Sequence, residues 1–300
     1  MRWLVSLCAL VAVAALASSF GARVALADEP VSAVDAAAIT IAPDHVPGFD
    51  ISWPQCPTGA FPPGPVAFGV IGVNNGKPFT SNPCFREQFA WANRVEQTPA
   101  VYVNTAFPKP GDPEALHGPY GACVEEDGWC RGYNYGWNLA KDVIQRAELA
   151  GVTPSHWWLD VEGGNYWSAE PNDNSQVVRA AVDYFRARGL PVGIYGTPYQ
   201  WRSIAGSIWQ SPGIPIWTAG AQGVDGAARR CDSAYAFAGG TVVMVQYYDW
   251  GFDTNFICPG TEAFFRHPVA HPLVSGPRGR SMSYLGAQLS YWHVVPMVSN

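Results

Sequence analysis

The feature that most restricts the fold of this chain is the alternation of short apolar segments with longer amphipathic ones. The apolar runs have the length of strands and number about seven or eight. The expected strands cover residues 48–53, 68–73, 100–105, 156–162, 191–196, 215–219 and 242–247. Helical periodicity is expected over residues 85–95, 134–150, 174–188 and 200–205, with a closing segment at 261–266.

Strands that alternate with helices form a parallel sheet. About seven or eight of them favour a closed, irregular (β/α) barrel of the TIM type in the α/β class. A doubly wound open sheet is the alternative, but no Gly-rich phosphate-binding turn follows the first strand. We therefore expect a single barrel domain over residues 48–266.

The two ends of the chain differ in composition from this domain. Residues 1–27 read as a signal peptide, with Arg2, an apolar stretch and a small-residue cleavage site at Ala25–Ala27. Residues 28–47 read as a flexible leader. Residues 267–300 show no clear period and are expected to be a tail without an assigned role. A protein exported in this way would be extracellular or associated with the cell wall.

The charge and the motifs of the sequence restrict which molecules the protein can bind. The net charge is -6 and no basic run is present, which argues against binding to nucleic acid or to an anionic membrane surface. After signal removal we expect no stable membrane span, and we expect a monomer. No cofactor motif occurs, so no cofactor is predicted.

Cysteines outside the expected signal peptide are even in number, which favours disulfides in an exported chain. Joining near neighbours in the sequence predicts the pairs Cys56–Cys84, Cys123–Cys130 and Cys231–Cys258. A metal site is the alternative. The sequence contains no CxxC spacing and no HExxH motif, so no metal is predicted. The Cys123–Cys130 pair would lie in a Pro- and Gly-rich stretch, residues 106–133, which we interpret as a lid or rim loop.

Acidic residues collect at the expected strand ends. Asp160 and Glu162 are two positions apart at the end of one strand, so they project to the same face. Asp50 and Asp253 fall near the ends of two other segments. In (β/α) barrels the active site lies at the carboxyl ends of the strands. The four acids are therefore the candidate catalytic residues.

Other polar and aromatic residues are expected at the same rim, where they would contact a substrate. These candidates are Asn104, Tyr195, Trp217, Gln246, Tyr247 and Trp53. A structural alternative is that each acid pairs with a basic residue, for which Arg202 is the nearest by sequence. One Arg cannot neutralise four acids.

Crowded carboxylates cannot all ionise freely, so the pKa of at least one should rise. A protonated carboxyl beside an ionised one is what glycosidic cleavage requires. The 13 Trp residues fit a sugar substrate, because flat rings can stack on pyranose rings, although core packing is the usual role of any single Trp.

Five motifs follow one another along the chain: Gly48–Trp53, Trp158–Glu162, Val192–Trp201, Ile216–Ala219, and Val245–Tyr247 ahead of Asp253. This ordered set resembles glycoside hydrolase family 25, the lysozyme-like muramidases, and in particular secreted actinobacterial proteins of this type. The resemblance covers about residues 48–266. It implies cleavage of the β-1,4 bond after N-acetylmuramic acid in peptidoglycan. Glu162 would match the general acid, Asp160 a stabilising carboxylate, Asp50 and Asp253 the flanking acids, and Tyr195 a groove residue.

The sequence departs from the family at two strand ends and in the disulfide-bearing loop. The second strand ends in Val73-Asn74-Asn75 rather than in a Lys-Ala-Thr-like sequence, and the third carries Asn104-Thr105 in place of a Tyr-His pair. Two other functions therefore stay open. One is a catalytically silent barrel that binds glycan at the cell wall, and the other is an exported structural protein that binds no saccharide.

Overall fold

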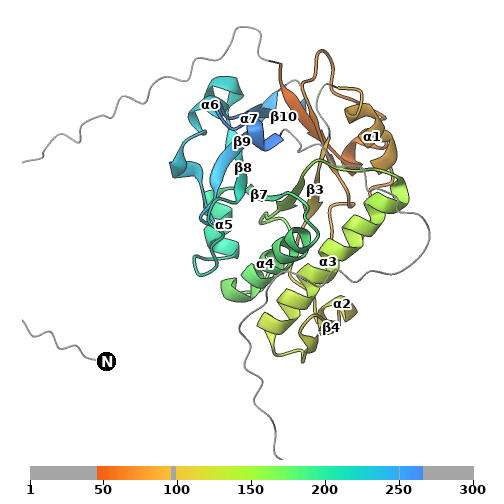
Figure 1. Cartoon of the computed structure of the whole chain (residues 1–300), viewed down its shortest axis with the longest axis vertical. Helices are drawn as coiled ribbons and strands as arrows, with labels where there is room; N and C mark the ends of the chain where they lie inside the picture. Colours follow the sequence, from red (N-terminus) through yellow and green to blue (C-terminus); the bar gives the residue numbers. More distant parts are fainter. Residues whose placement is uncertain (1–45, 96–98, 250, 266–300) are drawn as a thin grey trace, which may run out of the picture. The chain divides into compact units, whose positions relative to one another are not determined.

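The structure, a computed structural model, describes residues 46–95, 99–249 and 251–265. The expected signal peptide, the tail and all but the last two residues of the leader lie outside these ranges. The described chain forms a closed eight-stranded barrel with helices packed outside it (Figure 1). The predicted closed barrel is confirmed.

Eight strands form the barrel wall, and neighbours around it follow the order β1-β10-β9-β8-β7-β6-β3-β2. Their bounds are β1 Gly48–Ile51, β2 Gly69–Gly72, β3 Ala100–Asn104, β6 Trp157–Asp160, β7 Val192–Gly196, β8 Pro215–Ala221, β9 Thr241–Asp249 and β10 Phe252–Ile257.

The expected all-parallel sheet is wrong at one strand. β10 runs antiparallel to both of its neighbours, β9 and β1, whereas the other pairs are parallel. Only two residues separate β9 from β10. A connection this short cannot hold a crossover helix, so the chain must return as a hairpin.

The helices largely follow the predicted segments. Their bounds are α1 Phe85–Ala92, α2 Pro113–Leu116, α3 Gly128–Ala150, α4 Pro171–Ala187, α5 Pro198–Ile204, α6 Gly223–Arg229 and α7 Glu262–Phe265. Short 3-10 turns span Trp53–Gln55 and Ser233–Tyr235. The helix α6 was not expected. No helix among the described residues is long and apolar enough to cross a membrane.

The segment 106–133 is more ordered than the predicted loop. It contains α2, a small hairpin of β4 (His117–Gly118) and β5 (Gly121–Ala122), and the start of α3. Asp127 caps α3 by accepting a hydrogen bond from the Cys130 backbone N–H, so the helix begins before Asn134. All three predicted disulfides, Cys56–Cys84, Cys123–Cys130 and Cys231–Cys258, are confirmed.

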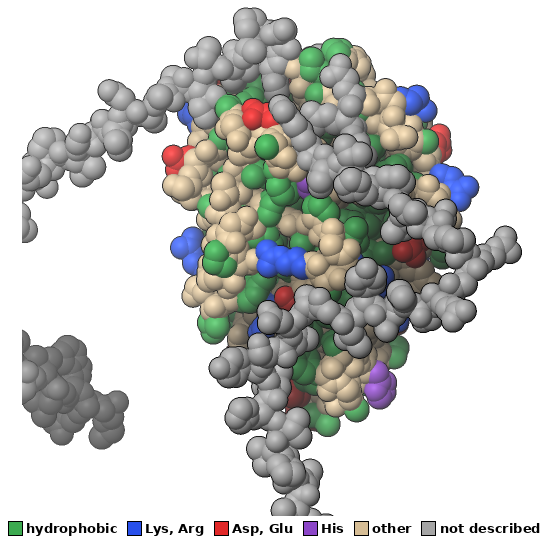
Figure 2. Space-filling model, viewed as in Figure 1, with side chains coloured by type: hydrophobic (Ala, Val, Ile, Leu, Met, Phe, Trp, Pro, Cys, Tyr) green, Lys and Arg blue, Asp and Glu red, His purple; other side chains and the backbone are tan. Residues whose placement is uncertain are grey.

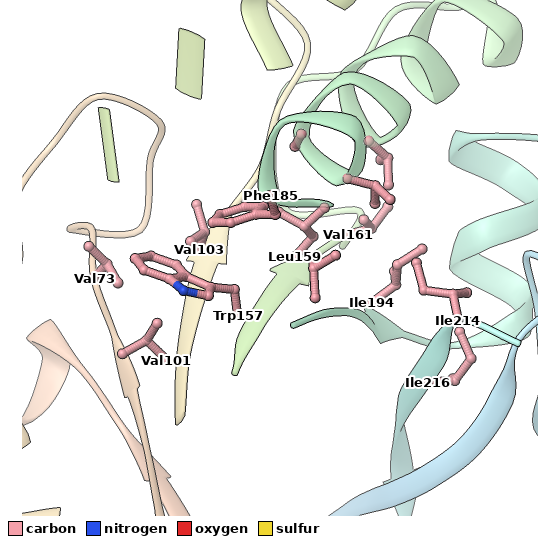
Figure 3. Close-up of a cluster of buried hydrophobic side chains, with 14 of the residues drawn as sticks. Val73, Val101, Val103, Trp157, Leu159, Val161, Phe185, Ile194, Ile214 and Ile216 are labelled. Atoms are coloured by element: carbon pink, nitrogen blue, oxygen red, sulfur yellow. The ribbon is translucent and has the colours of Figure 1, made fainter. Parts of the chain in front are cut away.

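Alternating strand residues build two cores. Those facing outward, including Val101, Leu159 and Ile194, pack under the helices with residues such as Phe185 of α4 (Figure 3). Those facing inward fill the barrel, with Trp158 and Trp217 as its largest side chains. Gly193 makes room for Trp158, since a Cβ at that position would lie 2.4 Å from the indole ring.

The helices α3 and α4 lie side by side and approach closely through glycine (Figure 1). A Cβ at Gly136 would lie 2.0 Å from the backbone oxygen of Val177 in α4. We expect Gly136→Ala to lower the free energy of unfolding by about 2–4 kcal/mol, because a backbone neighbour cannot rotate away. Denaturant unfolding measures this change.

A matched control exists in another helix. Gly226 lies within α6, and a Cβ there would meet its nearest atoms at 3.7–3.9 Å, which is ordinary contact. Gly226→Ala should be neutral or stabilise the protein by about 0.5–1 kcal/mol, as expected for Ala replacing Gly in a helix. Equal destabilisation by both substitutions would contradict the close-packing argument.

Candidate active site

The four predicted acids meet in one pocket of about 320 Å³ inside the mouth of the barrel. Its lining residues are Asp50, Tyr102, Asn104, Asp160, Glu162, Tyr195, Trp217, Gln246 and Asp253. Asp160 ends β6, and Glu162 follows two positions later on the same side. Val161 between them is buried in the outer core, as the two-residue period of a strand requires.

Strand register explains why these side chains meet. Asp160 of β6 pairs with Asn104 of β3 on one side and with Tyr195 of β7 on the other. Asp50 of β1 pairs with Asp253 of β10. Because β10 is antiparallel, Asp253 near its start lies at the rim where the parallel strands end. Residues at the same level that face inward therefore converge.

A hydrogen-bond network fixes Asp50 at the pocket floor. Its carboxylate accepts a hydrogen bond from Asn255 Nδ2 at 2.8 Å. Gln246 Nε2 also donates to its two oxygens, at 3.1 and 3.3 Å. Tyr195 donates its hydroxyl to Gln246 Oε1 at 2.7 Å, so the Gln246 amide is oriented from both ends.

Asp160 is held from β3. Asn104 Nδ2 donates to Asp160 Oδ2, and Thr105 donates to the Asp160 backbone oxygen through both its N–H and its hydroxyl. The other carboxylate oxygen, Oδ1, is buried and accepts no hydrogen bond from any described residue. One oxygen of this carboxylate is therefore left to interact with a bound molecule.

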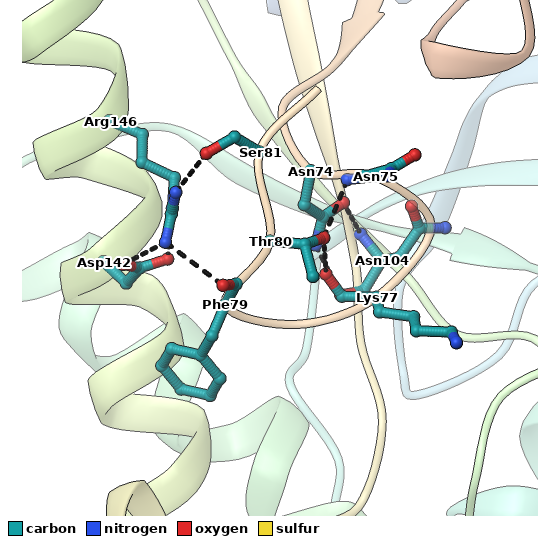
Figure 4. Close-up of polar contacts among 9 residues, drawn as sticks. All are labelled: Asn74, Asn75, Lys77, Phe79, Thr80, Ser81, Asn104, Asp142 and Arg146. Atoms are coloured by element: carbon teal, nitrogen blue, oxygen red, sulfur yellow. Dashed lines mark hydrogen bonds and ion pairs between the residues drawn. The ribbon is translucent and has the colours of Figure 1, made fainter. Parts of the chain in front are cut away.

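The end of β3 is itself fixed by a neighbouring loop. Asn74 and the Asn104 backbone exchange two hydrogen bonds of 3.0 Å (Figure 4). Arg146 of α3 pairs with Asp142 and donates to the backbone oxygen of Phe79 in the same loop. The side-chain amides of Asn74 and Asn104 thus brace the pocket wall.

The pocket carries several acids and no basic residue. Burial, and then the charge of Asp253, raises the pKa of Asp50 to about 8. Burial is also the largest cause that raises the pKa values of Asp160, Glu162 and Asp253. The proximity of Glu162 raises the pKa of Asp160 further.

The ion pairs that join described residues lie elsewhere and do not involve these four acids. Arg202 makes no ion pair with any of them. On the face shown in Figure 2, Lys and Arg side chains are scattered in small groups and form no basic patch. Nothing in the described structure therefore supports the alternative that the acids are structural partners of basic residues.

Glu162 lies nearer to solvent than Asp50 and Asp160. Its carboxylate accepts one hydrogen bond, from Gln200 Nε2 at 3.4 Å. Its backbone oxygen accepts a bond of 2.7 Å from the indole N–H of Trp167. Trp167 is thus placed to hold the loop after β6 rather than to contact a ligand.

Two of the predicted contact residues are not in the pocket. Tyr247 follows the inward-facing Gln246 in β9, so it points to the opposite side and packs in the outer core. Trp53 lies beyond the end of β1, is 42% exposed and packs against Gly76. Of the other candidates, Trp217 lines the pocket and donates its indole N–H to Asn255.

Three site residues were not predicted from the sequence. Tyr102 lines the pocket and stands two positions before Asn104 in β3, so strand alternation could have identified it. Asn255 belongs to β10, which was not recognised as a strand. Gln200 precedes Trp201 in α5 and gave no signal beyond its place in a family motif.

No group of three or more His, Cys, Asp or Glu residues in the described part of the chain could hold a metal ion. Three of the four acids, Asp50, Asp160 and Glu162, accept hydrogen bonds from side-chain amides.

A closed barrel whose acids, amides and aromatic rings meet at the carboxyl ends of its strands has the arrangement of barrel enzymes. Comparison with known proteins gives a more particular likeness. Residues 130–247 match the family model "Lysozyme-like protein 1". This match includes Asp160 and Glu162 but covers less than half of the chain.

Curated relatives carry lysozyme names. The chain is 30% identical over 103 residues to "Probable GH family 25 lysozyme 3" of Dictyostelium discoideum, covering 34% of this chain and 21% of that protein. It is 36% identical over 69 residues to "Lysozyme-like protein 5" of Caenorhabditis elegans, covering 23% and 32%. The chain thus spans a third or less of the length of these relatives.

Among solved structures, the modular Cpl-1 endolysin complexed with a peptidoglycan analogue is similar at a TM-score of 0.42 and 16% identity. That match covers 70% of this chain and 53% of the endolysin. The likeness to lysozyme-like proteins rests on the sequence comparisons, in which the family model matches the central part of the chain.

Proposed function

We propose that this protein is a secreted glycoside hydrolase that acts on the glycan of cell-wall peptidoglycan, in the manner of a muramidase. The observation that carries the proposal is the pocket itself. It gathers four carboxyl groups from β1, β10 and the end of β6, and no Lys or Arg lines it. The lysozyme names of the relatives support the same reaction.

Glu162 is the proposed general acid. Its carboxyl group is partly open to solvent, where a glycosidic oxygen can reach it, and burial beside Asp253 raises its pKa. A carboxyl group of raised pKa keeps its proton until the transition state and then delivers it to the leaving oxygen.

Asp160 is the proposed stabilising carboxylate. The amide of Asn104 holds one of its oxygens, while its buried Oδ1 has no partner among the described residues. That oxygen suits an acetamido N–H of the substrate or the positive charge that develops at the anomeric carbon. Asp50 and Asp253 flank this pair as further proposed catalytic acids, and Asn104, Tyr195, Trp217 and Gln246 as substrate contacts.

Secretion belongs to the same proposal. Three disulfides form among the described cysteines, as is usual for proteins of oxidising compartments. The signal peptide expected at residues 1–27 agrees with export. Trp53, exposed beyond the pocket, is a proposed contact for a more distant sugar of the chain.

The test is to incubate the purified protein with peptidoglycan and with chitin, which lacks the lactyl group of muramic acid. New reducing ends are reduced with borohydride and identified. We expect new muramic acid ends from peptidoglycan and few ends from chitin. Binding to peptidoglycan without new ends would instead support a silent glycan-binding barrel, and neither binding nor cleavage would support a structural protein.

A further inference from the structure

We propose that Gln200, oriented by the hydroxyl group of Thr197, is a positioning residue that holds the Glu162 carboxyl group and favours its ionised form. The catalytic consequence of this inference rests on the proposed function. The contacts that carry it are present in the protein itself. They link the first turn of α5 to the loop after β6.

Three hydrogen bonds form a chain from α5 to the acid. The Gln200 backbone N–H donates to Thr197 Oγ1 at 3.1 Å, which is the N-cap bond of α5. The Thr197 hydroxyl donates to Gln200 Oε1 at 3.0 Å. Gln200 Nε2 then donates to Glu162 Oε1 at 3.4 Å. The last bond is long, as hydrogen bonds to catalytic groups often are before a substrate binds.

The hydroxyl of Thr197 decides which end of the amide faces the acid. Its oxygen already accepts from the Gln200 backbone, so its single proton is free to donate to the side-chain oxygen. This places the amide NH₂ of Gln200 toward Glu162. An amide NH₂ donates strongly to a carboxylate, donates more weakly to the carbonyl oxygen of a neutral carboxyl group, and cannot accept a hydrogen bond from the carboxyl O–H. The contact therefore stabilises the charged form of Glu162 over the neutral form.

Gln200 is the one described side chain that donates to this carboxylate, and its effect opposes that of the surroundings. Burial and the charge of Asp253 raise the pKa of Glu162, and the hydrogen bond from Gln200 lowers it. Among the described residues, Asp50, Asp160 and Tyr195 also interact with Glu162 electrostatically, and none of them is a cation. Gln200 thus limits how strongly the pocket holds the proton of Glu162.

Such a limit matters for an acid that must give up its proton and regain it in each cycle. A carboxyl group that binds its proton too tightly is a poor donor to the leaving oxygen, and the best value lies near the working pH. Thr197 is the N-cap of α5 and Gln200 is the third residue after it, so this spacing sets the balance from a helix that contributes no residue to the pocket lining.

The test titrates the protein directly by NMR, with the Glu side-chain carboxyl carbons labelled and Glu162 assigned by comparison with Glu162→Gln. In Gln200→Leu we expect the midpoint for Glu162 to move up by roughly one pH unit, since a hydrogen bond to a charged group is lost. Thr197→Val should produce a smaller upward move, and Thr197→Ser, which keeps the hydroxyl, should restore the wild-type midpoint.

A matched control is Gln210→Leu, because Gln210 donates to the Ser207 backbone outside the pocket. It should leave the Glu162 midpoint unchanged. An unchanged midpoint in Gln200→Leu would overturn the inference, as would a downward move. If Gln200→Leu does not fold, Thr197→Val against Thr197→Ser decides by the same midpoint.

This titration needs no substrate, so it separates the inference from the proposed function. If the protein is inactive but the Glu162 midpoint still moves, the role of Gln200 is supported and the proposed glycosidase function is contradicted. In an active protein, the alkaline limb of the pH–rate profile should move in the same direction as the midpoint. An active protein with no such movement would overturn the inference alone.

Discussion

Glu162→Gln is expected to reduce the rate of glycan cleavage by about 10²–10⁴-fold, the range that general acid catalysis contributes. The amide has nearly the same shape as the acid and can still contact Gln200, but it has no proton to give to the leaving oxygen. Reducing ends released from peptidoglycan measure the loss. Glycan binding should be kept, because the other residues that line the pocket are unchanged.

The matched control is Glu148→Gln, which makes the same chemical change at an exposed position of α3, a helix that contributes no residue to the pocket lining. It should cleave at the wild-type rate. If Glu162→Gln cleaved as fast as Glu148→Gln, Glu162 would not be the acid, and Asp50 or Asp253 would be the next groups to replace. Equal binding by all three proteins with no cleavage by any would favour the silent barrel.

The barrel could be predicted because its signals are local. Each of its parallel strands is a short apolar run, and the amphipathic helices between them leave little choice of topology. β10 was missed for a physical reason. Its sequence, Phe252–Ile257, follows a two-residue turn and holds three polar residues in a row, Asp253 to Asn255. It therefore lacks both the continuous apolar run of a strand that is buried on both faces and the alternation of a half-buried one.

The placement of the acids in one pocket could also be predicted, because the period of a strand fixes which residues share a face. Asp160 and Glu162 followed from that rule, and Val161 does lie on the other side. The same rule should have excluded Tyr247, once Gln246 is placed inward, and should have included Tyr102 together with Asn104. These errors came from placing whole strand ends at the rim without assigning a face to each residue.

The hydrogen-bond partners of the acids could not be predicted. Asn255 donates a hydrogen bond to Asp50 across the β1–β10 pair, although most of the domain's sequence lies between these two residues. Gln200 reaches Glu162 only because α5 begins beside the loop after β6. Pairings of this kind depend on strand register and on helix placement, which a single sequence does not contain.

The stability of this protein should fall as the pH rises from about 4 to 8. Asp50 has a pKa of 3.8 when exposed and about 8 in the fold, with burial as the main cause. Between these values the folded state holds a proton that the unfolded state has lost. The folded state is therefore favoured below pH 4, and this advantage is lost as the pH rises through 8. Asp160, Glu162 and Asp253 are shifted in the same direction and add to the effect.

Asp50→Asn should flatten this dependence, because an amide does not ionise on transfer into the pocket. At pH 8 we expect the variant to be more stable than the wild type by about 2 kcal/mol, or roughly 4–8 °C in melting temperature, and the difference to vanish near pH 4. Melting curves across this range measure it, with the exposed Asp225→Asn as the matched control. Parallel pH curves for wild type and Asp50→Asn would show that Asp50 is ionised in the fold at neutral pH. The pocket would then lack its buried proton, and the assignment of acid roles within it would have to begin again from Glu162 and Asp253.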